Sequence, residues 1–80
     1  MQADYLLKII RGQPFVPFSL HLDDGTSFGI RHPDQILVLQ RTAIIGIPGR
    51  NGNEGFQSFV HCALMHVTRL EMEREPIEGP

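Results

Sequence analysis

The sequence has very few of the residues that would signal an extracellular or membrane protein. Its 80 residues include one cysteine, no tryptophan and one tyrosine. The single thiol, Cys62, cannot form an internal disulfide, so we expect a reducing, cytoplasmic location. The chain also lacks an apolar run of about 18 residues and the basic and long apolar regions of a secretory signal. We therefore expect no contact with a membrane.

Positive charge is scarce and scattered. Seven basic residues face nine acidic ones, for a net charge of −2. Nucleic-acid binders usually gather Lys and Arg in a patch, because neutralising phosphates supplies most of their affinity. No such cluster occurs along this chain, so RNA is a weaker candidate partner than protein. The length fits one domain, predicted over residues 1–75 with a flexible tail at 76–80. So small a core would gain readily from oligomerisation.

One helix is predicted at the start of the chain, over residues 3–11. Leu6, Ile9 and Ile10 recur at helical spacing, and Gly12 is a favourable stop. A helix this short is marginal alone, so its apolar side must pack on other elements.

The rest of the chain predicts antiparallel strands. Phe18, Leu20 and Leu22 alternate with polar residues, and Asp24-Gly25 is a strong signal for a tight hairpin. The predicted strands span residues 17–23, 26–32, 35–40, 42–48, 56–62 and 66–72. Five or six short strands in so short a chain close most easily into a small barrel. The predicted fold is therefore mainly β, an SH3/Sm-like antiparallel barrel with an N-terminal helix.

The segment "ILVLQRTAIIGI" is apolar on both faces of its predicted strands. A barrel interior takes only alternate residues, so the remaining side chains need another cover, either the helix or a partner. The candidate interface residues are Ile36, Val38, Ile44 and Ile45. The glycine-rich loop at 48–55 lacks a phosphate-binding motif, but it offers Arg50 and Asn51 as contacts at its tip.

The sequence gives little support for catalysis or for metal binding. His61 and Cys62 are adjacent on a predicted strand and point to opposite faces, and His66 lies beyond the next turn. Adjacent Asp23 and Asp24 are ordinary turn residues. We therefore predict no enzyme activity and no cofactor. A small metal-binding domain that uses His61, Cys62 or His66 stays open as an alternative.

The tripeptide His32-Pro33-Asp34 matches one that stimulates a partner ATPase in J-domain co-chaperones. In those proteins it lies between two long helices, whereas strands are predicted on both sides here. Pro33 fixes φ and ends strand pairing, and Asp34 can cap a bend. We therefore interpret the tripeptide as a corner between two strands.

The order of elements resembles the Sm-like fold, in which a helix precedes a hairpin with an Asp-Gly turn. Leu22, Asp24, Gly25, Phe28 and the strand at 37–39 carry this resemblance. It implies an RNA-binding ring as an alternative function. The family's RNA-contacting positions fall on other residue types here, at His32, Ile36, Ala63 and Leu64.

A wider pattern, "PFxPFxLHLxDGxxFxIxHPD…HVxRLE", resembles a group of small bacterial proteins of unassigned function. The matching residues are Pro14, Phe15, Pro17, Phe18, His32, Pro33, Asp34, Arg69, Leu70 and Glu71. The sequence as a whole favours a non-catalytic interaction module that forms homo-oligomers or binds another protein.

Overall fold

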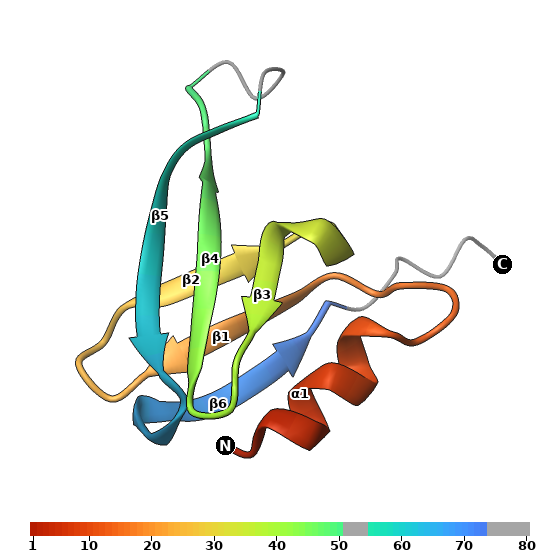
Figure 1. Cartoon of the computed structure of the whole chain (residues 1–80), viewed down its shortest axis with the longest axis vertical. Helices are drawn as coiled ribbons and strands as arrows, with labels where there is room; N and C mark the ends of the chain where they lie inside the picture. Colours follow the sequence, from red (N-terminus) through yellow and green to blue (C-terminus); the bar gives the residue numbers. More distant parts are fainter. Residues whose placement is uncertain (51–54, 74–80) are drawn as a thin grey trace, which may run out of the picture.

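The computed structural model describes residues 1–50 and 55–73, and this part of the chain is mainly β with one helix at its N-terminus (Figure 1). The prediction of antiparallel strands behind an N-terminal helix is confirmed. The predicted tail at 76–80 lies outside the described residues. The elements are α1 (Ala3–Ile10), β1 (Phe18–Leu22), β2 (Ser27–Ile30), η1 (Pro33–Gln35), β3 (Ile36–Val38), β4 (Thr42–Pro48), β5 (Phe56–Ala63), η2 (Leu64–His66) and β6 (Val67–Met72), where η denotes a 3₁₀ turn.

The strands form two open three-stranded sheets. Sheet A has the order β2-β1-β6, and sheet B has the order β3-β4-β5, with every pair antiparallel. Within the described residues the two sheets are not joined into the closed barrel that the sequence predicted. The chain passes from sheet A to sheet B through η1 and returns through η2. Strand pairing is interrupted at both of these corners, so each sheet keeps its own edges.

The hairpin predicted at Asp24-Gly25 is confirmed. It joins β1 to β2, and the Leu22 N–H donates to the Thr26 carbonyl at 2.9 Å. Gly25 has φ of 92°, a left-handed conformation that costs glycine little because it has no Cβ. The Asp24 carboxylate accepts the Thr26 N–H at 2.9 Å and also the Thr26 hydroxyl. These hydrogen bonds hold the pKa of Asp24 below its ordinary value, and the bond from the Thr26 hydroxyl contributes most.

The tripeptide His32-Pro33-Asp34 forms a corner between strands, as the sequence predicted. Pro33 is the first residue of η1, where its missing N–H costs no hydrogen bond. His32 precedes the turn in an extended conformation, and Asp34 lies within it, exposed. The corner therefore turns the chain out of β2 and into β3 without a long loop.

A buried glutamine connects this corner to both sheets. Gln35 is 5% exposed, and its side-chain oxygen accepts the Arg31 N–H at 2.7 Å. Its side-chain nitrogen donates to the carbonyls of Gly29 in β2 and Gly46 in β4, at 2.9 and 3.0 Å. One amide thus satisfies backbone groups in sheet A, in sheet B and at the corner between them.

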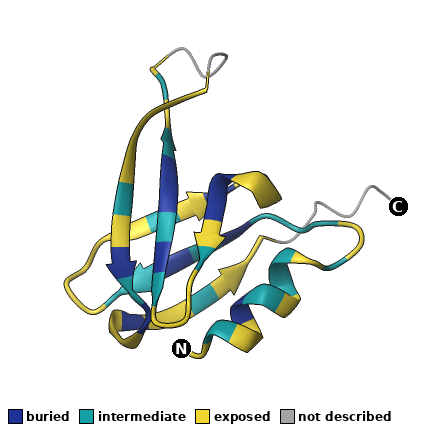
Figure 2. Ribbon diagram, viewed as in Figure 1, coloured by how far each residue is buried: buried dark blue, intermediate teal, exposed yellow. Residues whose placement is uncertain are grey.

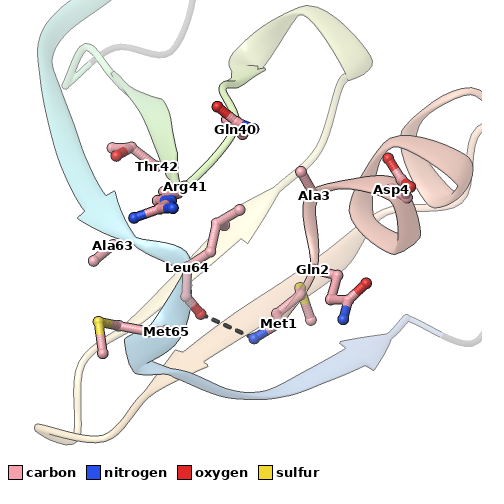
Figure 3. A pocket seen from close by; sticks show the side chains of 10 residues that line it. All are labelled: Met1, Gln2, Ala3, Asp4, Gln40, Arg41, Thr42, Ala63, Leu64 and Met65. Atoms are coloured by element: carbon pink, nitrogen blue, oxygen red, sulfur yellow. Dashed lines mark hydrogen bonds between the residues drawn. The ribbon is translucent and has the colours of Figure 1, made fainter.

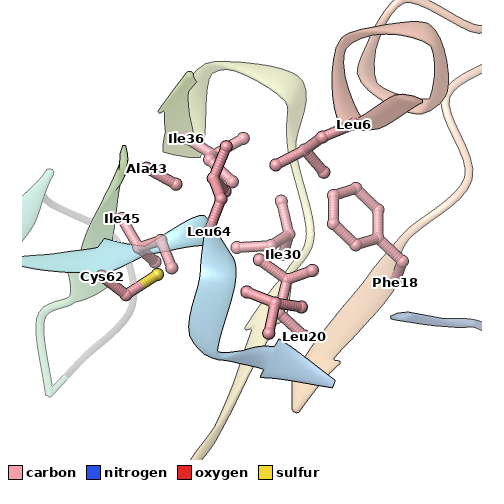
Figure 4. Packing of buried hydrophobic residues seen from close by; sticks show 10 residues of the cluster. Leu6, Phe18, Leu20, Ile30, Ile36, Ala43, Ile45, Cys62 and Leu64 are labelled. Atoms are coloured by element: carbon pink, nitrogen blue, oxygen red, sulfur yellow. The ribbon is translucent and has the colours of Figure 1, made fainter. Parts of the chain in front are cut away.

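The core lies between the two sheets, and buried positions alternate with half-buried ones along β1 and the first part of β4 (Figure 2). Side chains from both sheets and from α1 converge there (Figure 4). The buried cluster comprises Leu6, Phe18, Leu20, Ile30, Ile36, Ala43, Ile45, Cys62, Leu64 and Val67.

Helix α1 contributes one fully buried side chain, Leu6, while its neighbour Tyr5 is 54% exposed. The helix ends one residue before the predicted Arg11, and the Gly12 N–H donates to the Ile9 carbonyl at 3.3 Å. No helix in the described part of the chain has the length and apolar character needed to cross a membrane.

We expect Gln35→Leu to lower the free energy of unfolding by about 2–4 kcal/mol, because it leaves the buried Gly46 carbonyl and the partly buried backbone groups at Arg31 and Gly29 without their partner. Urea unfolding followed by circular dichroism measures this change. Gln40→Leu is the matched control, since Gln40 is exposed in the turn before β4. An unchanged urea midpoint for Gln35→Leu would show that the amide does not hold the sheets.

The lowered pKa of Asp24 predicts a pH-dependent stabilisation. A carboxylate with a depressed folded-state pKa stabilises the fold above its ordinary pKa of 3.8, and the stabilisation is lost as the pH falls through the folded-state value. Asp24→Ala should therefore lower the melting temperature at about pH 7, and the difference from wild type should shrink at about pH 2.5. A difference that is the same at both pH values would contradict this account.

Candidate functional site

The outward-facing side of sheet A is polar. His21 Nε2 lies 3.0 Å from Glu71 Oε1, and Arg69 Nη2 lies 3.4 Å from the same oxygen. Beside the sheet, Arg31 Nη1 lies 2.6 Å from Glu73 Oε1. Exposed ion pairs like these add little stability, but they keep a sheet face hydrated. This face therefore has the character of a surface in contact with water.

The outward-facing side of sheet B is mainly apolar, although the exposed His61 is paired with Ile44 and lies on the same side. Leu37 is paired with Ile44, so the two side chains share a face, and Leu37 is 59% exposed. Gly46 lies two residues after Ile44 in β4 and is paired with Phe59, which is 60% exposed. Phe56 joins them over Gly46. We call Leu37, Ile44, Phe56 and Phe59 the outer apolar face.

Gly46 makes room for the aromatic part of this face. A Cβ on Gly46 would lie 2.8 Å from ring atoms of Phe56, closer than van der Waals contact allows. The Phe56 and Phe59 rings are 5.7 Å apart between centroids and inclined at 66°, an edge-to-face geometry that aromatic pairs favour. The glycine thus lets Phe56 lie flat on β4 beside Phe59.

The strand register assigns the predicted interface residues to different environments. Ile45 is fully buried and Ile36 is 7% exposed, so both belong to the core. Val38 packs against that core. Ile44 is the one of the four that faces outward, since it alternates with Ala43 and Ile45 along β4. The two core isoleucines are consequently not available to a partner.

Sequence reasoning missed the three most exposed members of the outer apolar face. The sequence did not show that Leu37 faces outward and its neighbours inward, because a run of apolar residues has no alternation between polar and apolar positions. Phe56 and Phe59 are three residues apart, a spacing that normally places strand residues on opposite faces. A register irregularity at Ile47/Pro48 brings Phe56 over Gly46, whose cross-strand partner is Phe59. Such an irregularity has no clear sequence signal.

One of the two predicted loop contacts lies in the described part of the chain. Arg50 is exposed beyond the end of β4. Asn51 lies outside the described residues. The Gly49 N–H donates to the Gly55 carbonyl at 3.4 Å, so pairing of the two chain segments continues past β4. The hairpin therefore carries three of the four residues of the outer apolar face and has the exposed Arg50 beyond the end of β4.

The candidate metal ligands do not converge. Cys62 is buried in the core, and this burial raises the pKa of its thiol. His61 is exposed and faces away from it, in the row of Ile44. His66 Nδ1 lies 2.8 Å from Asp23 Oδ2, which ties η2 to the β1–β2 turn. Among residues 1–50 and 55–73, no three His, Cys, Asp or Glu side chains are grouped closely enough to hold a metal ion.

A hollow lies where the start of α1 meets η2 (Figure 3). The Met1 ammonium donates to the Leu64 carbonyl at 3.1 Å across its floor. Its charged side chains are Asp4 on the helix and Arg41 in the turn before β4, which lie on opposite sides of the hollow. This arrangement joins the helix to η2. The outer apolar face, with its large exposed side chains, is the stronger candidate for a functional surface.

Comparisons of the chain with protein-family models, with curated proteins and with solved structures found no match. A function must therefore be inferred from the molecule's own surface.

We expect Gly46→Ala to destabilise the protein by about 1–3 kcal/mol, because the new methyl group collides with the Phe56 ring and forces it to move. In a Phe56→Ala background the same substitution should cost much less. A double-mutant cycle measured by urea unfolding gives this coupling. Equal costs of Gly46→Ala in both backgrounds would show that Phe56 does not occupy the space over Gly46.

Proposed function

We propose that this protein is a non-catalytic interaction module that self-associates through the outer apolar face. The observation that supports this proposal is the contrast between the outward sides of the two sheets. Sheet A is lined by ion pairs on its outward side, whereas sheet B exposes Leu37 and Phe59 to roughly 60%. Exposed apolar clusters on a water-soluble domain usually mark a contact surface, and aromatic residues are enriched there.

The size of the outer apolar face fits an interface centre. Its four side chains expose on the order of 300 Å², the size of the patches that mark interaction sites. A stable interface buries about 800 Å² on each partner. The face would therefore form the dry centre of a larger contact that includes neighbouring backbone and polar side chains.

We also propose that the two sheets are the halves of an SH3/Sm-like barrel that is left partly open. The support is the path of the chain, which continues from β2 into β3 through η1 and from β5 into β6 through η2. In such a barrel, β2 with β3 and β5 with β6 would each correspond to one bent strand that joins the two sheets. The turns η1 and η2 would then be the corners of the barrel.

The alternatives raised by the sequence have less support. An Sm-like RNA-binding ring needs a basic surface, and both Arg31 and Arg69 are paired with acidic side chains. A metal-binding role for His61, Cys62 or His66 needs these side chains to converge, and Cys62 lies in the core. A protein partner, and first of all a second copy, remains the better-supported choice.

We expect the mass of the wild-type protein in solution to rise with concentration from 9.0 kDa towards at least twice that value. Phe59→Glu should suppress the rise, because a carboxylate on the outer apolar face would have to be buried without a partner. Light scattering on the eluting peak measures both. Met65→Glu is the matched control, since Met65 is 80% exposed on η2, away from this face.

A wild-type protein that stays at 9.0 kDa over the whole concentration range would contradict self-association. A mass that rises equally in wild type and Phe59→Glu would show that copies meet through another surface.

A further inference from the structure

His61 introduces a titratable group into the outward side of sheet B. The strands β3, β4 and β5 contain no Asp, Glu, Lys, Arg or Tyr, and their two titratable side chains are His61 and Cys62. Cys62 is buried in the core, whereas His61 is exposed on the other side of β5. The charge carried by the outward side of these strands therefore depends on the protonation of His61.

The strand register places His61 among the residues of the outer apolar face. Leu37 pairs with Ile44, and Ile44 pairs with His61, so these three side chains form one row across the sheet. Phe59 lies two residues from His61 along β5 and on the same side. Neighbouring strands are about 4.8 Å apart, and same-side residues are about 7 Å apart along a strand. A partner that covers both Ile44 and Phe59 must therefore also meet His61.

No carboxylate forms an ion pair with His61 in the described part of the chain. Strands β3 and β4 present only uncharged side chains to it. A hollow between β5 and the β1–β2 hairpin is lined by His61, Asp23, Asp24 and His66. Asp23 is paired there with His66, and Asp24 accepts the Thr26 N–H. An imidazolium at His61 would therefore depend on water for its solvation.

We propose that protonation of His61 is a switch that releases the contact through the outer apolar face. The inference rests on the proposed self-association and adds its regulation. A neutral imidazole can be covered together with Ile44 and Phe59, whereas covering an imidazolium that has no partner charge is costly. Self-association brings two such groups to the contact, one from each copy, and like charges repel.

The sign of the pH dependence follows from this cost. Protons bind the separate chains in preference to the associated ones, so a fall in pH favours separation. Histidine ordinarily changes its charge between about pH 5 and pH 8. Association should accordingly be tight at the upper end of this range and weak at the lower end.

The test compares dissociation constants at about pH 8 and about pH 5.5 by sedimentation equilibrium. Wild-type association should be about tenfold or more weaker at the lower pH. His61→Gln keeps a polar side chain that cannot be charged, so its association should be equal at both pH values. His21→Gln, on the outward side of sheet A, and His66→Gln, in the hollow, are the matched controls. Both should keep the wild-type pH dependence.

The outcomes separate this inference from the proposed function. Wild-type association that is equal or tighter at the lower pH would overturn the switch and leave self-association in place. A pH dependence that survives in His61→Gln would also overturn the switch, because another group would then be responsible. A wild-type chain that stays at 9.0 kDa at both pH values would overturn the proposed function and this inference together. Far-UV circular dichroism of each variant at both pH values confirms that the fold is retained.

Discussion

The arrangement of the two sheets depends on one buried amide. Gln35 bonds the backbone of β2, of β4 and of the corner between them, and it does so inside the core. A buried polar group is favourable only when its hydrogen bonds are satisfied, so this network allows one relation between the sheets. Because the corner is held in this way, β3 begins with Ile36 pointing inward and Leu37 pointing outward. The outer apolar face follows from that orientation.

The two sheets then differ in what they offer to the surroundings. Sheet A pairs its charges on the outside, and its edges carry charged side chains or lead into them. Sheet B exposes apolar side chains, and its long edge strand β5 carries no charge. Both sheets contribute to the same core, so the difference is confined to their outward sides. This difference between the outward sides is the basis for the proposed contact surface on sheet B.

Several conspicuous local features have structural roles. The His32-Pro33-Asp34 tripeptide shapes the corner that places Gln35, and Cys62 fills the core. His66 and Asp23 tie η2 to the first hairpin. Gly46 makes room for Phe56. Short motifs of this kind have little specificity, because the neighbours that decide their role come from distant parts of the chain.

The sequence by itself determined the N-terminal helix, the Asp24-Gly25 hairpin and the succession of antiparallel strands, because these depend on local periodicity and turn chemistry. It did not determine which residues of "ILVLQRTAIIGI" face outward, since a run of apolar residues carries no alternation to read. Only the tertiary structure decided that Ile36 and Ile45 belong to the core while Leu37 and Ile44 do not. It also placed Phe56 beside Phe59, and it left the sheets open where a closed barrel was expected. Register, bulges and sheet closure arise from contacts between distant segments, and no short stretch of sequence encodes them.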